Sequence, residues 1–257
     1  MPRQSKKVSY FVILTYIITI LFFIVLQING GNRNPFSKGL IGLSMTFPII
    51  SVIIVQKLIF REELKGSLGI PFKLNVWFLY SILIPIIMAL IINLISIKRF
   101  EGTLFSYREF YINIIIGLTI AAVSALIEEL AWRGFLFNEL QTLGILKSSI
   151  LTGIIWALWH TPISIWYKYP ESPLSGAVIN FVQMFFISLI ITYIRSKSES
   201  VFACAIMHGL FNTMILSSIM DDFKIVLIKI LLCILVLAIL IICDSYKKNF
   251  ILHHRKI

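Results

Sequence analysis

The chain has 257 residues, of which 58% are hydrophobic, and it carries a formal net charge of +11. Its mean hydropathy of +0.93 excludes a soluble domain with a single anchor, because several apolar stretches reach the roughly 20 residues that a helical span of the bilayer needs. The basic residues gather in short connections and at both ends, so lipid headgroups rather than nucleic acid are the predicted counter-charge.

The order of apolar and polar stretches predicts an all-α fold, a polytopic membrane protein with about eight transmembrane helices in a single domain, residues 1–257. The first apolar run is long for the core of a secretory signal and has no clear cleavage site, so we keep it as an uncleaved span. Pro48 and Pro85 interrupt the second and third spans, which packed membrane helices tolerate. The predicted spans cover residues 8–28, 39–60, 74–97, 111–143, 148–167, 174–195, 201–219 and 224–243.

The positions of Lys and Arg predict how the chain is oriented. If the N-terminus is cytoplasmic, about two thirds of the 23 basic residues fall on the cytoplasmic side, as the positive-inside rule favours. We therefore expect an integral protein of a bacterial plasma membrane with both termini in the cytoplasm.

Three charged residues interrupt the apolar sequence between Ser124 and Phe137, namely Glu128, Glu129 and Arg133. Each costs roughly 2.5 to 3.5 kcal/mol at membrane depth before pairing. Helical spacing places Glu129 and Arg133 on one face, where they can form an ion pair, and turns Glu128 toward a different neighbour. A structural ion pair accounts for Glu129 and Arg133. Glu128 has no cationic partner at helical spacing and needs another reason to be there.

A second adjacent acid pair, Glu62 and Glu63, serves as an internal comparison. It follows Arg61 in a polar connection rather than in a predicted span. We expect this pair to be solvated.

Two later spans bring polar residues to a similar depth. His160 and His208 lie roughly 18 Å and roughly 10 Å from the cytoplasmic starts of their spans, at 1.5 Å per residue. Glu128 lies on a helix that runs the opposite way, so the three side chains can meet between the midplane and the inner leaflet. Asn212 follows His208 by one helical turn on the same face. Three helices thus direct polar groups at one depth.

These side chains allow three interpretations. As packing residues, the histidines would hydrogen bond within the helix bundle. As a hydrolytic site, a carboxylate and an imidazole would hold a water and accept its proton, while the second imidazole and an amide would steady an oxyanion. As a metal site, Glu128, His160 and His208 would bind a divalent cation such as zinc, which would activate a bound water. Spacing does not separate the last two.

Three motifs in this order resemble those of the CPBP intramembrane proteases, also called the Abi or CAAX prenyl protease type II family. The motifs are EExxxR at Glu128, Glu129 and Arg133, FxxxH at Trp156 and His160, and HxxxN at His208 and Asn212. The resemblance covers residues 110–220, the motif core. One departure is Trp156, where the family pattern has Phe. We expect Trp156 to keep an aromatic wall and to narrow the cavity.

The resemblance implies a multi-helix fold with a cavity open toward the cytosol. It also implies hydrolysis of a peptide bond in a membrane-associated, hydrophobic or lipidated peptide or protein. Since family members have been described both as metal-dependent and as glutamate proteases, it leaves the cofactor open between a metal such as zinc and none. The implied roles of the motif residues are water activation by Glu128, water binding by His160, oxyanion stabilisation by His208 and Asn212, and orientation of the site by Glu129 and Arg133.

Two other functions remain open. A proton-coupled transporter also places ionisable residues inside the membrane, although no pair of corresponding broken helices marks two repeats. A bacteriocin-immunity or signalling protein would bind a peptide without cleaving it. Under the protease interpretation the predicted partners are membrane lipids and a hydrophobic or lipidated peptide, and no nucleic acid.

Overall fold

A computed structural model describes residues 3–64, 68, 72, 74–100, 105–216 and 223–254, and all regular structure within these residues is helical. Each of the eight predicted stretches coincides with helix, except that residues 217–219 of the seventh lie outside the described residues. The α-helices are α1 (Arg3–Ile28), α2 (Pro35–Leu40), α3 (Phe47–Ile53), α5 (Val76–Phe100), α6 (Tyr107–Leu118), α7 (Ile120–Glu129), α8 (Phe137–Leu140), α9 (Ile145–Trp159), α10 (Thr161–Ile163), α11 (Pro173–Ser198), α12 (Val201–Phe211) and α13 (Phe223–His254).

Short segments of other helical types join several of these helices. Tighter 3₁₀ turns occupy Gly31–Arg33, Ile41–Thr46 and Gln141–Leu143. Wider π-helical segments occupy Ile54–Ile59, Leu130–Leu136, Ser164–Lys168 and Asn212–Leu216.

The all-α, polytopic membrane class is confirmed, and the number of eight spans stays a prediction. Among the described residues, five helical stretches are long and apolar enough to cross a bilayer, and a sixth results if α6 and the helix after it form one span bent by 41°. The stretch Val201–Leu216 is apolar but shorter.

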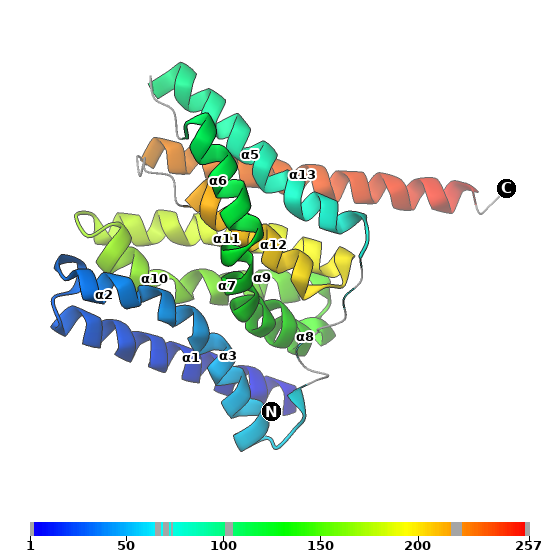
Figure 1. Ribbon diagram of the computed structural model, residues 1–257. Helices are drawn as coiled ribbons and strands as arrows, with labels where there is room; N and C mark the ends of the chain where they lie inside the picture. The colour runs from blue at the N-terminus through cyan, green and yellow to red at the C-terminus, as the bar shows by residue number, and fades with distance from the viewer. Residues whose placement is uncertain are drawn as a thin grey trace.

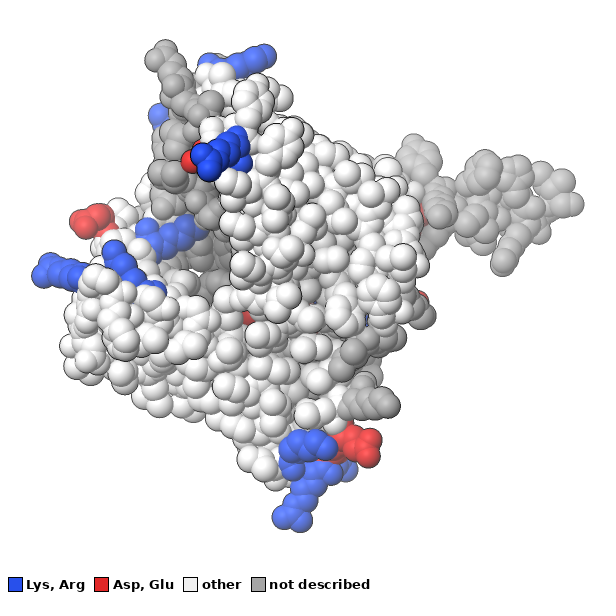
Figure 2. All heavy atoms as spheres, in the orientation of Figure 1, with Lys and Arg blue, Asp and Glu red and all other residues white. Residues whose placement is uncertain are grey.

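The surface of the helices is as apolar as their interior, as expected of a protein in lipid. Along α1 the buried positions Phe11, Thr15 and Phe23 face the bundle, while Ile13 and Ile17 are about half exposed on the other side. A helix that is apolar all round belongs in a core or a membrane. Figure 2 shows the same pattern for the whole molecule, with a largely uncharged body and charged side chains gathered at its ends.

The packing of α12 brings three distant parts of the chain together. It contacts α5, α6 and α7, while α11 packs along α9 and α13 (Figure 1). Gly209 permits the approach of α12 to α6 and α7, because a Cβ there would lie 2.5 Å from the carbonyl oxygen of Gly117 on α6 and 2.6 Å from the amide nitrogen of Ala122 on α7. The backbone of α12 therefore lies directly against the backbones of Gly117 and Ala122, at the residue that follows His208.

One expectation about the polar connection was wrong. Glu62 is not simply solvated, because it pairs with Lys7 and with Arg3 at 2.8 Å. Arg61 adopts a left-handed conformation with φ 55°, which turns the chain back toward the start of α1. Glu63 is exposed, as expected.

Candidate active site

The acidic motif lies where α7 ends and a π-helical segment begins. Glu128 and Glu129 are the last residues with α-helical bonding, and Arg133 lies within the π-helical Leu130–Leu136. Glu128 is 2% exposed, and Glu129 and Arg133 are fully buried. A wide π-helical turn of this kind is frequent at functional sites, and no sequence pattern predicted it.

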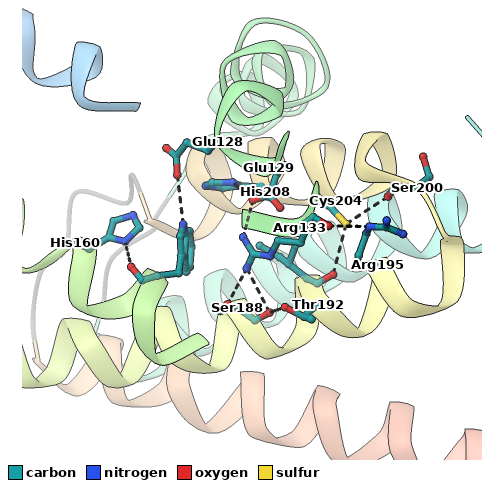
Figure 3. A network of polar contacts seen from close by, with 12 residues as sticks. Glu128, Glu129, Arg133, His160, Ser188, Thr192, Arg195, Ser200, Cys204 and His208 are labelled. Carbon is teal, nitrogen blue, oxygen red and sulfur yellow. Dashed lines mark hydrogen bonds and ion pairs between the residues drawn. The ribbon is translucent and has the colours of Figure 1, made fainter. Parts of the chain in front are cut away.

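Glu129 is the centre of a buried network. Its Oε1 accepts from Arg133 Nη1 at 2.7 Å and from His208 Nδ1 at 2.8 Å. Arg133 Nη2 also donates to Ser188 Oγ at 2.8 Å on α11. The ion pair predicted from the spacing of Glu129 and Arg133 is present, and it connects α7, α11 and α12 (Figure 3).

Trp156 joins Glu128 to His160. The indole Nε1 of Trp156 donates to Glu128 Oε2 at 3.3 Å, and the backbone carbonyl of Trp156 lies 2.8 Å from His160 Nδ1. Because a carbonyl can only accept, Nδ1 must carry the proton, and the Nε2 of neutral His160 is left with a lone pair. His160 can therefore accept a hydrogen bond from a water through Nε2.

A hydrogen bond at Nδ1 also fixes the orientation of the His208 ring. Its Nδ1 donates to Glu129, whose carboxylate is paired with Arg133, so Nε2 is the ring nitrogen left for other partners. The Trp156 ring packs against both imidazoles in T-shaped contacts. Its centroid lies 4.5 Å from that of the His160 ring and 5.4 Å from that of the His208 ring. Both rings are therefore held in single orientations.

A cavity of about 510 Å³ collects the remaining polar groups. Its lining includes Glu128, His160, His208 and Asn212, the four residues predicted to carry chemistry. Figure 2 shows this face of the molecule hollowed, with a basic side chain inside the hollow. The cavity volume lies within the usual range for a small-molecule or peptide site.

The other predicted residues, Glu129, Arg133 and Trp156, are buried next to the cavity and do not line it. Glu129 and Arg133 are not among the lining residues, and Glu129 contacts the lining residue His208 through a hydrogen bond. Trp156 was expected to form an aromatic wall that narrows the cavity. It is fully buried and absent from the lining, and its neighbour Trp159 lies there instead. The reason is that the Trp156 indole turns inward to meet Glu128 and the guanidinium of Arg133, 4.9 Å from the ring centroid.

Sequence reasoning missed several polar partners. Ser188 accepts from Arg133, and Asn180 and Lys168 line the cavity. A serine or asparagine in a membrane helix and a lysine at the end of one are common residues in common places. Only the folded structure shows that these residues contact Arg133 or line the cavity.

The cavity lies in the half of the molecule away from the N-terminus. Its lining comes from late in α1 at Phe23, from the turn at Ile41–Thr46, from the end of the helical stretch at Lys168 and from early in α11 at Asn180. If both termini are cytoplasmic, as the basic residues predict, this half faces away from the cytoplasm. The expectation of cytoplasmic termini and the expectation of a cavity open to the cytosol therefore exclude each other.

The predicted metal set is not assembled by the side chains as they stand. Within the described ranges, no group of three His, Cys, Asp or Glu side chains is close enough to hold a metal ion. Glu128 Oε2 accepts from Trp156, and His208 Nδ1 is turned to Glu129.

Comparisons with known proteins agree with the motifs. A family model described as type II CAAX prenyl endopeptidase Rce1-like matches residues 110–214. The chain is also 32% identical over 229 residues to CAAX prenyl protease 2 of Methanococcus maripaludis, an alignment that covers 81% of each chain.

Proposed function

The chain belongs to the CPBP family of type II CAAX prenyl endopeptidases, and on that premise we propose that it hydrolyses a peptide bond in a hydrophobic or lipidated substrate with a water that Glu128 activates. The observation that carries the proposal is the cavity lined by Glu128, His160, His208 and Asn212. Family membership supports a peptidase with membrane helices, and the geometry of the cavity supports the roles that we propose for its residues.

The attacking water would lie between Glu128 and His160. The lone pair on His160 Nε2 accepts one hydrogen of the water, and the carboxylate of Glu128 takes the proton as the oxygen attacks the carbonyl carbon. The hydrogen bond from Trp156 orients the carboxylate. Because the proton of His160 is on Nδ1, its Nε2 can accept a hydrogen bond from the water and cannot donate one.

The oxyanion would form beside His208 and Asn212. The side-chain amide of Asn212 is a donor on that side of the cavity, and donors held in place before the reaction stabilise the developing charge. His208 would donate from Nε2 only with a proton on both ring nitrogens, because its Nδ1–H is already directed to Glu129. When the C–N bond breaks, Glu128 returns its proton to the amine that leaves, so the products are a carboxylic acid and an amine.

The test is cleavage of fluorogenic peptides, lipidated and plain, by purified protein in lipid nanodiscs. Glu128→Gln keeps the shape of the side chain and removes the base, so kcat should fall by roughly 10² to 10⁴ fold. His160→Ala should lower kcat by roughly 10² fold. A parallel reaction with a chelator asks whether a metal takes part.

The matched control is Glu63→Gln, which makes the same change in an exposed acid and should leave turnover unchanged. Full turnover by Glu128→Gln would rule out the mechanism. Immunity or signalling that survives in Glu128→Gln, without any hydrolysis by the wild type, would favour the non-hydrolytic function. Ion flux that Glu128→Gln abolishes would favour the transporter.

A further inference from the structure

A second cavity borders the catalytic cavity on the side of α1. It has a volume of about 400 Å³, and its lining comes from the middle of α1 and from the chain between the end of α9 and the π-helical Ser164–Lys168. Ile20 and Leu158 in this lining are 42% and 46% exposed. The cavity therefore opens on the surface of the bundle that faces lipid, and we call it the α1 groove.

Trp159 belongs to both cavities. It is the one described residue that lines the catalytic cavity and the α1 groove alike. It is the last residue of α9, directly before His160, and it is 6% exposed. A side chain that borders two cavities forms the wall between them. The indole of Trp159 therefore closes the catalytic cavity on the side of α1.

The indole of Trp159 is held in one orientation. Its Nε1 donates to Oγ1 of Thr19 at 2.8 Å, in a buried hydrogen bond between α9 and α1. The Thr19 hydroxyl donates to the backbone carbonyl of Thr15 at 2.7 Å, which leaves its oxygen to accept from the indole. The ring also packs on the rings of Trp132 and His160, with centroids 5.5 Å and 4.9 Å away. No water in hydrocarbon can replace the hydrogen bond if it breaks.

Helix α1 supplies the support for this wall. Besides Thr19, the hydroxyl of Tyr16 donates to the backbone carbonyl of Ile155 at 2.6 Å and ties α1 to α9 one turn before Trp159. Helix α1 lies outside residues 110–214, which match the family model. The wall is therefore fixed by a part of the chain that lies outside that match.

A rigid indole at this point limits how long an apolar group in the catalytic cavity can be. Each further methylene group that is buried strengthens binding by roughly fourfold. A hydrocarbon chain that ends against the indole gains nothing from further length. Without the indole, the chain could continue into the α1 groove, whose lining is mainly apolar.

We propose that Trp159, held by Thr19, determines specificity by limiting the size of the apolar group that the catalytic cavity accepts. The proposal rests on the peptidase function proposed above. Trp159 selects the substrate, whereas Glu128 and His160 act on the bond. Thr19 is a positioning residue, because it acts through the indole.

The test compares the binding of peptides that differ only in the length of one hydrocarbon chain. Dye-labelled peptides carry an octyl, dodecyl or hexadecyl group on a single cysteine, and fluorescence anisotropy in nanodiscs measures their binding to the Glu128→Gln protein, which retains them uncut. Adding Trp159→Ala should shift the ratio of the two Kd values in favour of hexadecyl over octyl by about tenfold or more, the gain expected from burying two further methylene groups. Partition of the peptides into the bilayer cancels in this comparison of variants.

The matched control is Trp166→Ala, which removes the same side chain from a residue that lines the α1 groove and not the catalytic cavity. The ratio should stay unchanged, because the indole of Trp159 still closes the passage. An unchanged ratio in Trp159→Ala, an equal shift in Trp166→Ala, or no binding of any of the peptides would overturn the size limit.

Thr19 is tested by a milder pair of variants that leaves the tryptophan in place. Thr19→Val removes the acceptor of the indole N–H, and the ratio should shift about threefold in the same direction, as expected for the loss of one neutral hydrogen bond. Thr19→Ser keeps the hydroxyl and should retain the ratio of the parent protein. The same ratio in both variants would overturn the positioning role of Thr19.

Turnover of the octyl peptide by the wild type tests the peptidase function separately. Cleavage of this peptide together with an unchanged binding ratio in Trp159→Ala would overturn the size limit and leave the peptidase standing. A shifted ratio without cleavage of any of the three peptides would overturn the peptidase and leave the size limit standing.

Discussion

At the scale of single residues, the site combines groups that stand out in the sequence with groups that do not. Glu128, His160 and His208 are visible because polar residues are rare and costly in apolar helices. The hydrogen bond from Trp156 to Glu128 is not visible, since a tryptophan in a membrane helix has many ordinary uses. The motif residues were therefore predictable, while the partner that orients the carboxylate required the structure.

Trp156→Phe tests the role of that partner. Phenylalanine keeps an aromatic ring but cannot donate to Glu128 Oε2, so we expect kcat to fall about tenfold with little change in KM, the loss expected for one hydrogen bond to a charged group. The measurement is steady-state cleavage of a fluorogenic peptide. The control is Trp132→Phe, because Trp132 is also fully buried but its Nε1 has no hydrogen-bond partner among the described residues. Equal losses in both variants would mean that ring volume, not the indole N–H, matters.

The buried ion pair makes a prediction about stability. Arg133→Met leaves Glu129 charged and buried without its guanidinium, which should lower the free energy of unfolding by about 3 to 5 kcal/mol. The double variant Glu129→Gln, Arg133→Met removes both charges and should recover most of that loss. Unfolding in mixed detergent and SDS micelles measures both. A double variant no more stable than Arg133→Met alone would contradict this explanation.

At the scale of elements, helices were predictable and their internal irregularities were not. The spans at 174–195 and 224–243 coincide with α11 and α13 because long apolar runs leave few other possibilities. The π-helical turns after Glu129 and from Asn212 lie directly after α7 and α12, and single-sequence periodicity does not predict them. These turns lie directly at the site.

Gly209→Ala tests the close approach of α12. The added Cβ would lie 2.5 Å from the carbonyl oxygen of Gly117, so the helices must separate, at a cost of about 1 to 3 kcal/mol. Activity should fall as well, because His208 is the adjacent residue. Thermal unfolding and turnover are measured together. In Gly39→Ala a Cβ meets nothing within 4 Å, and this variant should match the wild type in both.

The ion pair at the start of α1 makes stability depend on pH. The hydrogen bond from Lys7 lowers the pKa of Glu62 below its usual value. The folded protein therefore gains stability from this group above the ordinary glutamate pKa of about 4.3 and loses it as the pH falls through the lower folded pKa. Glu62→Gln should be less stable than wild type at pH 7 and indistinguishable from it in strong acid. Melting curves across pH check this, and a difference that grows toward low pH would contradict it.

At the scale of the whole molecule, the orientation in the membrane decides which compartment the cavity faces. The distribution of Lys and Arg predicts cytoplasmic termini, and the structure places the cavity in the opposite half. Sequence alone could predict the first and not the second, since the cavity exists only once α1, α9 and α11 have packed.

Cysteine labelling in intact cells measures this orientation. In a background without the three native cysteines, Lys38→Cys lies at the end of the molecule that carries the cavity, and Arg3→Cys lies at the other. With cytoplasmic termini, a membrane-impermeant maleimide should label Lys38→Cys in intact cells, and Arg3→Cys only after permeabilisation. The reverse pattern would place the cavity toward the cytosol.

The cluster of tryptophans around the site gives the protein an optical probe of its own. Of its five tryptophans, Trp156 and Trp159 flank His160 with ring centroids 4.5 Å and 4.9 Å away, and Trp132 packs on Trp159 at 5.5 Å. Indole emission responds to nearby water and charge. A peptide that displaces water from the cavity should therefore shift the intrinsic fluorescence, and occupancy can be followed without a dye, in real time, on the unmodified chain.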